Sequence, residues 1–291
     1  MRLILLFCLS SLSLLQAQLL PEALGTFPAD TTALEYDNLS ALRKLPNYQE
    51  LRQQYSSDAL RRVKQTFLLL GIPEDQLSQV VTASGPNGFF GLVEGNFQAN
   101  TATKKAIEQN FSRATLHGGS ALCSPNAVCI FFPDQHPGSA AFGNLEQLRA
   151  MLGVSAGHSP AINTDHSFTK LLTGLDDRAP VIGIAPGSEI RELLKNVAPQ
   201  ALSSRFDLSQ MLPAIEGVGY GVEIDTNAHL TINLLCSSQA ESKLLTSTLN
   251  AASNLQRMAA FASNDSLPFR NLIATPAGSM VRLRLDAKLI P

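Results

Sequence analysis

The 291-residue chain repeats one order of secondary-structure patterns, and this repetition limits its fold more than any other feature. Residues 30–140 and residues 180–290 both read strand, helix, two strands, helix, two strands. Strands joined by short turns pair as antiparallel sheets, and helices then cover a sheet face. We therefore predict an α+β protein with an internal duplication: two similar halves, each β-α-ββ-α-ββ, whose antiparallel sheets are covered by helices on one face.

The individual patterns have the periods of half-buried strands and amphipathic helices. Val218, Tyr220 and Val222 alternate with other residues along one strand. Along the last strand, Arg282 and Arg284 alternate with apolar residues, which predicts one solvent-facing side. Two helical stretches carry apolar or small residues at helical spacing, which predicts a buried side. These residues are Leu60, Val63, Phe67 and Leu70 in the first half, and Leu244, Leu245, Thr248, Ala252, Leu255 and Ala259 in the second.

A stretch rich in Gly, Pro, Ser and His separates the two halves. We place the first half at 18–160, a linker with a short helix at 161–178 and the second half at 179–291. Residues 139–144 (SAAFGN) suggest an additional edge strand. Each half is large enough for its own core, since domains average ~150 residues.

Three glycines, Gly85, Gly88 and Gly91, lie where the first two adjacent strand patterns meet. A phosphate-binding loop needs its glycines immediately before a helix, so that backbone N–H groups converge on the anion. These glycines enter a strand instead, and they therefore predict a turn.

The N-terminus has the pattern of a secretory signal peptide over residues 1–17: Arg2, a short apolar run and a small residue at the exit. No later stretch is apolar for the ~20 residues that a membrane span needs. We expect an exported protein, periplasmic or secreted, without a transmembrane span after signal removal. A net charge of −2 and the lack of a basic patch argue against a nucleic-acid partner.

The segment CSPNAVC places Cys123 and Cys129 on either side of a turn. Two strands flanking that turn would bring the sulfur atoms together, so we expect a disulfide, with two free thiols as the alternative. Cys236 shares its strand parity with Leu230 and Leu234, and we expect it to be a small buried apolar residue.

Two short motifs are similar to those of esterases. HGGS spans His117 to Ser120, and GVSAG places Ser155 in a G-x-S-x-G pattern, with Asp165 and His229 following in the order of a triad. In an α/β-hydrolase that serine lies on a sharp strand-to-helix turn. Here it follows a helical pattern for which Gly153 resembles a C-terminal cap, so the context disfavours hydrolysis.

Four histidines lie within fifty residues of one another, near Asp134 and Asp165: His117, His136, His158 and His166. A zinc site needs three or four ligands, and no pair here has the spacing that would position them. Asp165 fits the N-terminal cap of a short helix instead. We expect no metal and no cofactor.

The layout resembles that of a group of uncharacterised exported bacterial proteins. The shared features are Leu20-Pro21 after the signal peptide, Leu45-Pro46 after the first strand and short helix, and LGIPEDQLSQVVTA as a helix-to-strand junction. The resemblance implies export and duplication, and it supplies no catalytic residues. We therefore expect a non-catalytic binding protein with a protein or small-molecule partner in the cell envelope, and the groove between the halves is a candidate position for that partner. The alternative is an envelope serine hydrolase using Ser155.

Overall fold

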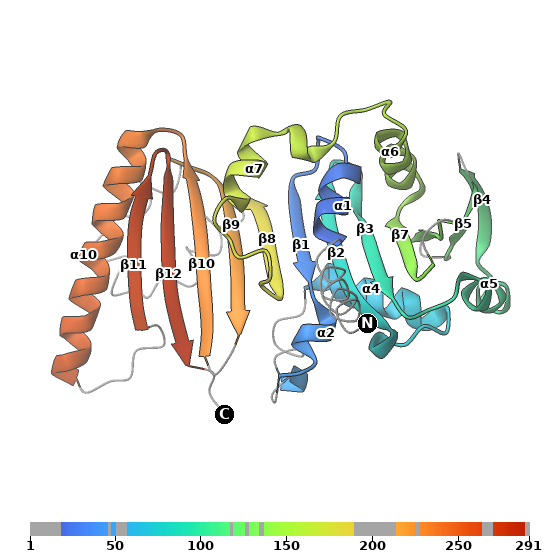
Figure 1. Ribbon diagram of the computed structural model, residues 1–291, viewed down its shortest axis with the longest axis horizontal. Coiled ribbons are helices and arrows are strands. Elements are labelled where there is room, and N and C mark those ends of the chain that lie inside the picture. The colour runs from blue at the N-terminus through green and yellow to red at the C-terminus, as the bar shows by residue number, and fades with distance from the viewer. Residues whose placement is uncertain are drawn as a thin grey trace, which may run out of the picture. The chain divides into compact units, whose positions relative to one another are not determined.

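The computed structural model describes residues 19–45, 48–50, 57–116, 119–125, 128–133, 137–188, 214–224, 227–263 and 270–288 (Figure 1). These residues form an α+β protein with antiparallel strand pairs, in agreement with the predicted class. The chain divides into two units. One contains residues up to 31 and residues 36–163, and the other contains residues 32–35 and residues from 164 onward. The predicted signal peptide lies outside the described residues.

The first unit combines helices with an antiparallel sheet of strand order β2-β3-β7-β6-β5-β4. Its helices are α1 (Leu19–Thr26), α2 (Leu39–Leu42), α4 (Asp58–Leu69), the 3-10 turn η1 (Glu74–Gln76), α5 (Ala99–Glu108) and α6 (Leu145–Ser155). Its strands are β2 (Leu77–Gly85), β3 (Gly88–Gly95), β4 (Ser112–Leu116), β5 (Gly119–Cys123), β6 (Cys129–Phe131) and β7 (Ser139–Gly143). Strand β1 (Ala33–Asp37) is divided between the units, and η2 (Ile162–Thr164) spans their second boundary.

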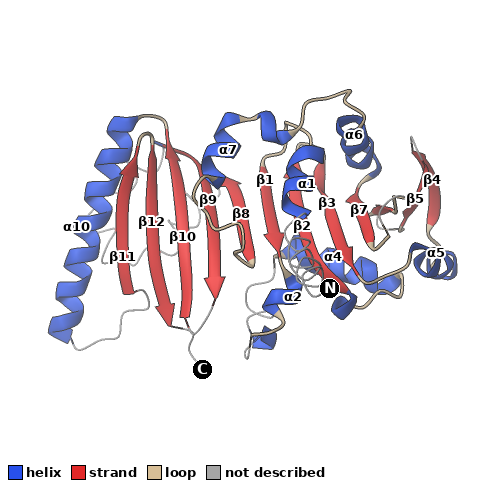
Figure 2. Cartoon of the chain, in the orientation of Figure 1, coloured by secondary structure: helices blue, strands red, loops and turns tan. Residues whose placement is uncertain are grey.

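The second unit has the strand order β8-β9-β10-β12-β11. Its elements are α7 (His166–Leu172), β8 (Val181–Pro186), β9 (Ile215–Ile224), β10 (Asn227–Cys236), α10 (Gln239–Ser263), β11 (Arg270–Ala277) and β12 (Met280–Lys288). The helix predicted between β8 and β9 falls mostly on residues 189–213, which lie outside the described residues. Figure 2 distinguishes the helices from the strands.

Helices pack on both faces of the first unit's sheet, so the prediction of one covered face is wrong there. Phe90 of β3 contacts Phe27, which follows α1, with ring centroids 5.0 Å apart. Phe142 of β7 pairs with Gly91, the neighbour of Phe90, so its ring lies on the opposite face. There it meets Phe67 of α4 at 6.5 Å. Both faces are apolar, which is why both need a helical cover.

Helices also pack on both faces of the second unit's sheet. Helix α10 contacts β10, β11 and β12, and its Leu245 joins the core formed by Val218, Leu234 and Val281. Helix α7 packs against β9 and β10, where it approaches Gly219, whose strand neighbour is Val218. Since successive residues of a strand point to opposite faces, α7 and α10 lie on different faces.

Several local predictions are confirmed. The predicted buried side of α4 is buried at all four positions, Leu60, Val63, Phe67 and Leu70. The junction LGIPEDQLSQVVTA runs from the end of α4 through η1 into β2. The glycine-rich stretch is the β2–β3 hairpin, in which Gly85 pairs with Gly88.

Other local predictions need correction. Leu244 of α10 is 59% exposed, and the buried residues described on that helix are Ser242, Leu245, Thr246 and Ser253. Residues 139–144 do not form an edge strand, because β7 lies between β3 and β6 with all five residues buried. The sequence reasoning also missed α1, whose Leu19 and Ala23 are fully buried, and the short edge strand β4.

Gly91 is required by close packing and not by a turn. A Cβ atom there would lie 2.0 Å from the Val81 carbonyl oxygen and 2.4 Å from Cζ of Phe142. The Phe142 ring thus covers the backbone of β3 and occupies the space that a side chain would need.

We expect Gly91→Ala to lower the free energy of unfolding by about 2 kcal/mol or more, because backbone and a packed ring must shift. Gly25→Ala in α1 is the matched control, since a Cβ there meets nothing within 4 Å. Alanine should stabilise that helix by about 0.5–1 kcal/mol. Urea denaturation measures both effects, and equal midpoints for the two variants would contradict this account.

Candidate functional site

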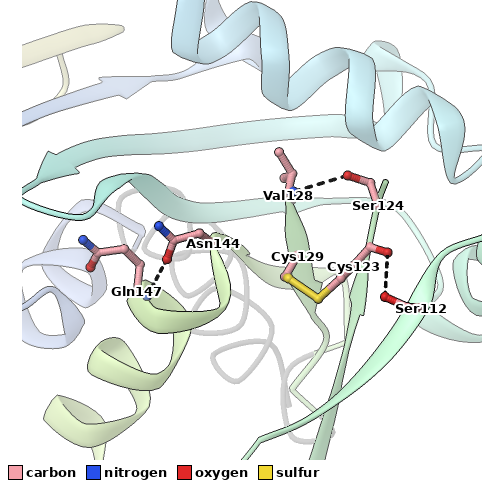
Figure 3. Close-up of a disulfide and its surroundings, with 7 residues drawn as sticks. All are labelled: Ser112, Cys123, Ser124, Val128, Cys129, Asn144 and Gln147. Carbon is pink, nitrogen blue, oxygen red and sulfur yellow. Dashed lines mark hydrogen bonds between the residues drawn. A yellow bond between two sulfur atoms is a disulfide. The ribbon is translucent and has the colours of Figure 1, made fainter. Parts of the chain in front are cut away.

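The predicted disulfide joins Cys123 of β5 to Cys129 of β6, with an S–S distance of 2.06 Å (Figure 3). The two cysteines are a cross-strand pair. The connecting turn is closed further by Ser124, whose N–H donates to the Val128 carbonyl at 2.8 Å. The Ser124 Oγ accepts the Val128 N–H at 3.3 Å. The bridge therefore fixes a turn that its own hydrogen bonds also define, which is a structural role.

Ser155 does not occupy a strand-to-helix turn. It lies in the last turn of α6, where its Oγ donates to the Met151 carbonyl at 3.1 Å. The helix ends at Ser155 with Ala156 as its C-cap, so Gly153 is inside the helix and is not its cap. Gly157 follows with φ of 74°, and the N–H groups of Gly157 and His158 donate to the carbonyls of Val154 and Gly153. This is a Schellman ending, so the G-x-S-x-G pattern here forms a helix end.

The predicted histidine and aspartate residues do not form a metal site in the described part of the chain. His158 and His166 are exposed, and Asp165 caps α7 by accepting the N–H groups of Ser167 and Phe168. His117, Asp134 and His136 lie outside the described residues. Among the residues that the structure describes, no group of three or more His, Cys, Asp and Glu side chains could hold a metal ion. Ser120 of the HGGS motif is exposed on β5, opposite Thr115 of β4.

Three glycines on β9 provide a flat surface for α7. Gly217, Gly219 and Gly221 occupy alternate positions and so share one face of the sheet. A Cβ at Gly219 would lie 2.4 Å from the Leu171 carbonyl oxygen, and one at Gly217 would lie 2.9 Å from Cδ1 of Leu171. At Gly219 the added atom would meet backbone, so only glycine there lets the end of α7 approach the strand so closely, whereas at Gly217 the flexible end of the Leu171 side chain could move.

The C-terminal end of α7 is held by two polar side chains of the sheet. Asn233 of β10 is fully buried, and its Nδ2 donates to the carbonyls of Leu171 at 2.8 Å and Thr173 at 3.1 Å. Arg282 of β12 donates from Nη2 to the Thr173 carbonyl at 2.8 Å and from Nε to Asn233 Oδ1 at 3.1 Å. A cation at a helix C-terminus is favoured by the helix dipole. The two side chains thus satisfy carbonyl groups that the helix leaves unpaired.

The remainder of this face is polar, and we call it the open face: Glu223, His229, Thr231, Arg284 and Asp286. Arg284 is exposed, and the other four residues are half-buried. His229 of β10 lies between Glu223 of β9 and Asp286 of β12 in the register of the sheet. Its Nδ1 is 2.8 Å from Oδ1 of Asp286, and the two side chains are 40% and 46% exposed. Arg284 is exposed beside Thr231. The arrangement presents hydrogen-bonding groups of both charges on paired strands.

An exposed apolar residue borders the open face. Ile273 of β11 pairs with Arg284 and is 53% exposed. Protein–protein interfaces combine apolar contacts with a polar, solvent-accessible rim, and arginine is enriched in them. Sequence alternation identified Arg282 and Arg284 as one side of a strand, but nothing in it distinguished Arg282, which holds the helix, from the exposed Arg284.

We expect Arg282→Ala to lower the free energy of unfolding by about 1–3 kcal/mol, because it removes two hydrogen bonds and deprives the buried Asn233 Oδ1 of a donor. Arg284→Ala, two residues along the same strand, is the matched control and should change stability by about 0.5 kcal/mol or less. Thermal or urea unfolding compares the two variants. Equal losses would show that Arg282 does not hold α7.

Cys236 is a buried free cysteine, as the strand pattern predicts. Burial raises the pKa of its thiol to about 11, with Glu241 and Glu216 adding to the effect.

The thiolate is the reactive form of cysteine, so we expect the native Cys236 to react with a thiol reagent at pH 8 about a hundredfold more slowly than the unfolded protein. A chain that begins at Gln18 tests this, because Cys8 is absent from it. If Cys236 reacted as fast in the native protein as in urea, its thiol would not be buried with a raised pKa.

No protein-family profile and no curated protein matches this chain. Solved structures do match it. Crystal forms I, III and IV of TP0453, a Treponema pallidum protein, align with TM-scores of 0.50, 0.51 and 0.50 at 13%, 10% and 11% sequence identity. Each alignment covers 91% of this chain, and 91%, 94% and 92% of the respective TP0453 chains. At this identity the similarity shows a shared fold. Among the helices in the described ranges, none combines the length and the hydrophobicity that a transmembrane span requires.

Proposed function

We propose that the chain is an exported, non-catalytic binding protein whose open face contacts a protein or small-molecule partner in the cell envelope. The observation that supports this most is that the charged side chains of the open face, Glu223, Arg284 and Asp286, remain exposed or half-exposed on an otherwise packed sheet. In the first unit, both sheet faces are covered by helices and buried aromatic rings. The open face is therefore the described sheet surface on which a partner has most to contact.

The strand pairing of the open face makes it a preformed surface, which favours the binding of a partner. Its strands are held by continuous ladders from β9 through β10 to β12. Its border with α7 is fixed by Asn233 and Arg282. A preformed surface loses less conformational entropy on association than a flexible one.

Export is supported by the signal-like N-terminus and by the Cys123–Cys129 disulfide, since disulfides persist in oxidising compartments. We further propose that the units arose by duplication. In each, the last strand lies beside the second strand of the central hairpin, β7 beside β3 and β12 beside β10. A binding groove between the halves stays a prediction.

The alternative, a serine hydrolase using Ser155, has weaker support. A nucleophilic serine is activated by a neighbouring base and held at an exposed turn. The Ser155 hydroxyl instead donates to a carbonyl of its own helix. Labelling of the protein by a fluorophosphonate probe, lost in Ser155→Ala, would favour the hydrolase and overturn the proposal.

A photo-crosslinking residue at Thr231 tests the proposed contact in cells of the source organism. We expect a covalent adduct from Thr231, and its loss when Arg284→Glu reverses the charge beside it. The same residue at Ser247, exposed on α10, is the control and should give no adduct of that mass. Equal adducts from both positions, or none from Thr231, would contradict binding at the open face.

A further inference from the structure

We propose that α10 is an edge guard: its polar side chains occupy the outward hydrogen-bonding groups of the edge strand β11 and prevent a second copy of the chain from pairing there. Strand β11 ends the strand order of the second unit. An edge strand offers a row of unpaired N–H and C=O groups to any extended segment, including the same strand of another copy. Figure 1 shows α10 running alongside β11.

The pairing of β11 with β12 determines which backbone groups point outward. Ala277 pairs with Met280 across a two-residue turn, and Thr275 pairs with Arg282. These pairs carry the ladder hydrogen bonds, so the intervening residues direct their N–H and C=O groups away from β12. Ala274 and Pro276 are therefore outward residues of the strand. The register shifts between Arg270 and Ile273, and in that segment the Leu272 carbonyl points toward Ser253 of α10.

Side chains of α10 bind those outward groups one after another. Asn250 pairs with both groups of Ala274: its Nδ2 donates to the carbonyl at 3.0 Å, and its Oδ1 accepts the N–H at 3.1 Å. An approaching strand would make this same pair of bonds. Ser253 Oγ donates to the Leu272 carbonyl at 3.3 Å.

Two other features act on the backbone of β11 and of the β11–β12 turn near the end of the contact with α10. Ser242, fully buried, donates from Oγ to the carbonyl of Gly278 in the β11–β12 turn at 2.7 Å. Pro276 has no N–H group and so offers no donor to a neighbouring strand. Proline at an edge is a common means of preventing edge-to-edge pairing.

The spacing of the helix residues matches the strand. From Ser242 to Asn250 the helix rises about 12 Å. From Gly278 to Ala274 the strand, running in the opposite direction, spans about 13 Å. The polar residues Ser242, Thr246, Asn250 and Ser253 fall on one stripe of the helix, beside the apolar stripe that contains Leu245. This explains why α10 buries polar residues where sequence periodicity predicted mainly apolar contacts.

A second copy of β11 fits the guarded edge when the guard is absent. Antiparallel pairing of Leu272 with Ala274 of another copy, and the reverse, would form a twofold pair of strands. That register places Ile273 opposite its own equivalent. Ile273 is 53% exposed, so a cysteine there can report the pairing by forming a disulfide between copies.

The test compares Asn250→Ala/Ser253→Ala with the matched control Asn254→Ala/Ser247→Ala, which removes the same groups from exposed positions of α10. In the first variant, exchange of the Ala274 amide should be about tenfold faster than in the control, as expected for the loss of its hydrogen bond. Light scattering should show that Asn250→Ala/Ser253→Ala, but not the control, associates increasingly as the protein concentration rises. With Ile273→Cys added, only the first variant should form disulfide-linked dimers on oxidation.

Three results would overturn the proposal. One is equal Ala274 exchange in the two variants. Another is faster exchange without association, which would make Asn250 a packing contact only. A third is association without an Ile273→Cys crosslink. If the first variant fails to fold, the wild-type protein still decides: an Ala274 amide that exchanges as fast as an unprotected amide rules out the guard.

Discussion

The structure depends on how backbone groups are satisfied where the strand ladders and helices stop. A buried N–H or C=O group without a partner is costly, so each interrupted ladder needs a substitute. Long polar side chains supply it in both units. Arg43 donates to the carbonyls of Glu74 and Leu77 around η1. Asn233 closes the end of α7, and Asn250 takes the place of a neighbouring strand.

The two units use their sheets differently. In the first, α1 and α6 cover one face and α4 and α5 the other, and apolar strands such as β7 are buried throughout. In the second, α10 covers one face, while α7 covers only the end of the other that the glycines of β9 leave flat. The uncovered part is the open face. The proposed binding role follows from this difference between the two sheets.

Much of the local structure was predictable from the sequence, while the candidate site was less so. Turn residues between apolar runs located the β2–β3 and β9–β10 hairpins, and the CSPNAVC spacing predicted the disulfide. The prediction for Gly153 failed because a second glycine, Gly157, supplies the Schellman geometry four residues later. His229 was considered only as part of a triad, whereas it lies beside Asp286 on β12. The strand register brings His229 and Asp286 together although more than fifty residues separate them in the sequence. A short-range sequence pattern carries no information about that register.

The sequence by itself determined most of the elements, the β2–β3 and β9–β10 hairpin turns and the antiparallel α+β class, because these depend on residues adjacent in the chain. Only the tertiary structure decided which sheet faces are covered, which polar residues of α10 are buried and which charges remain open. The physical reason is that burial depends on what packs against a surface. From the sequence alone, an asparagine such as Asn250 is expected to face solvent, but in the structure it binds the edge of β11.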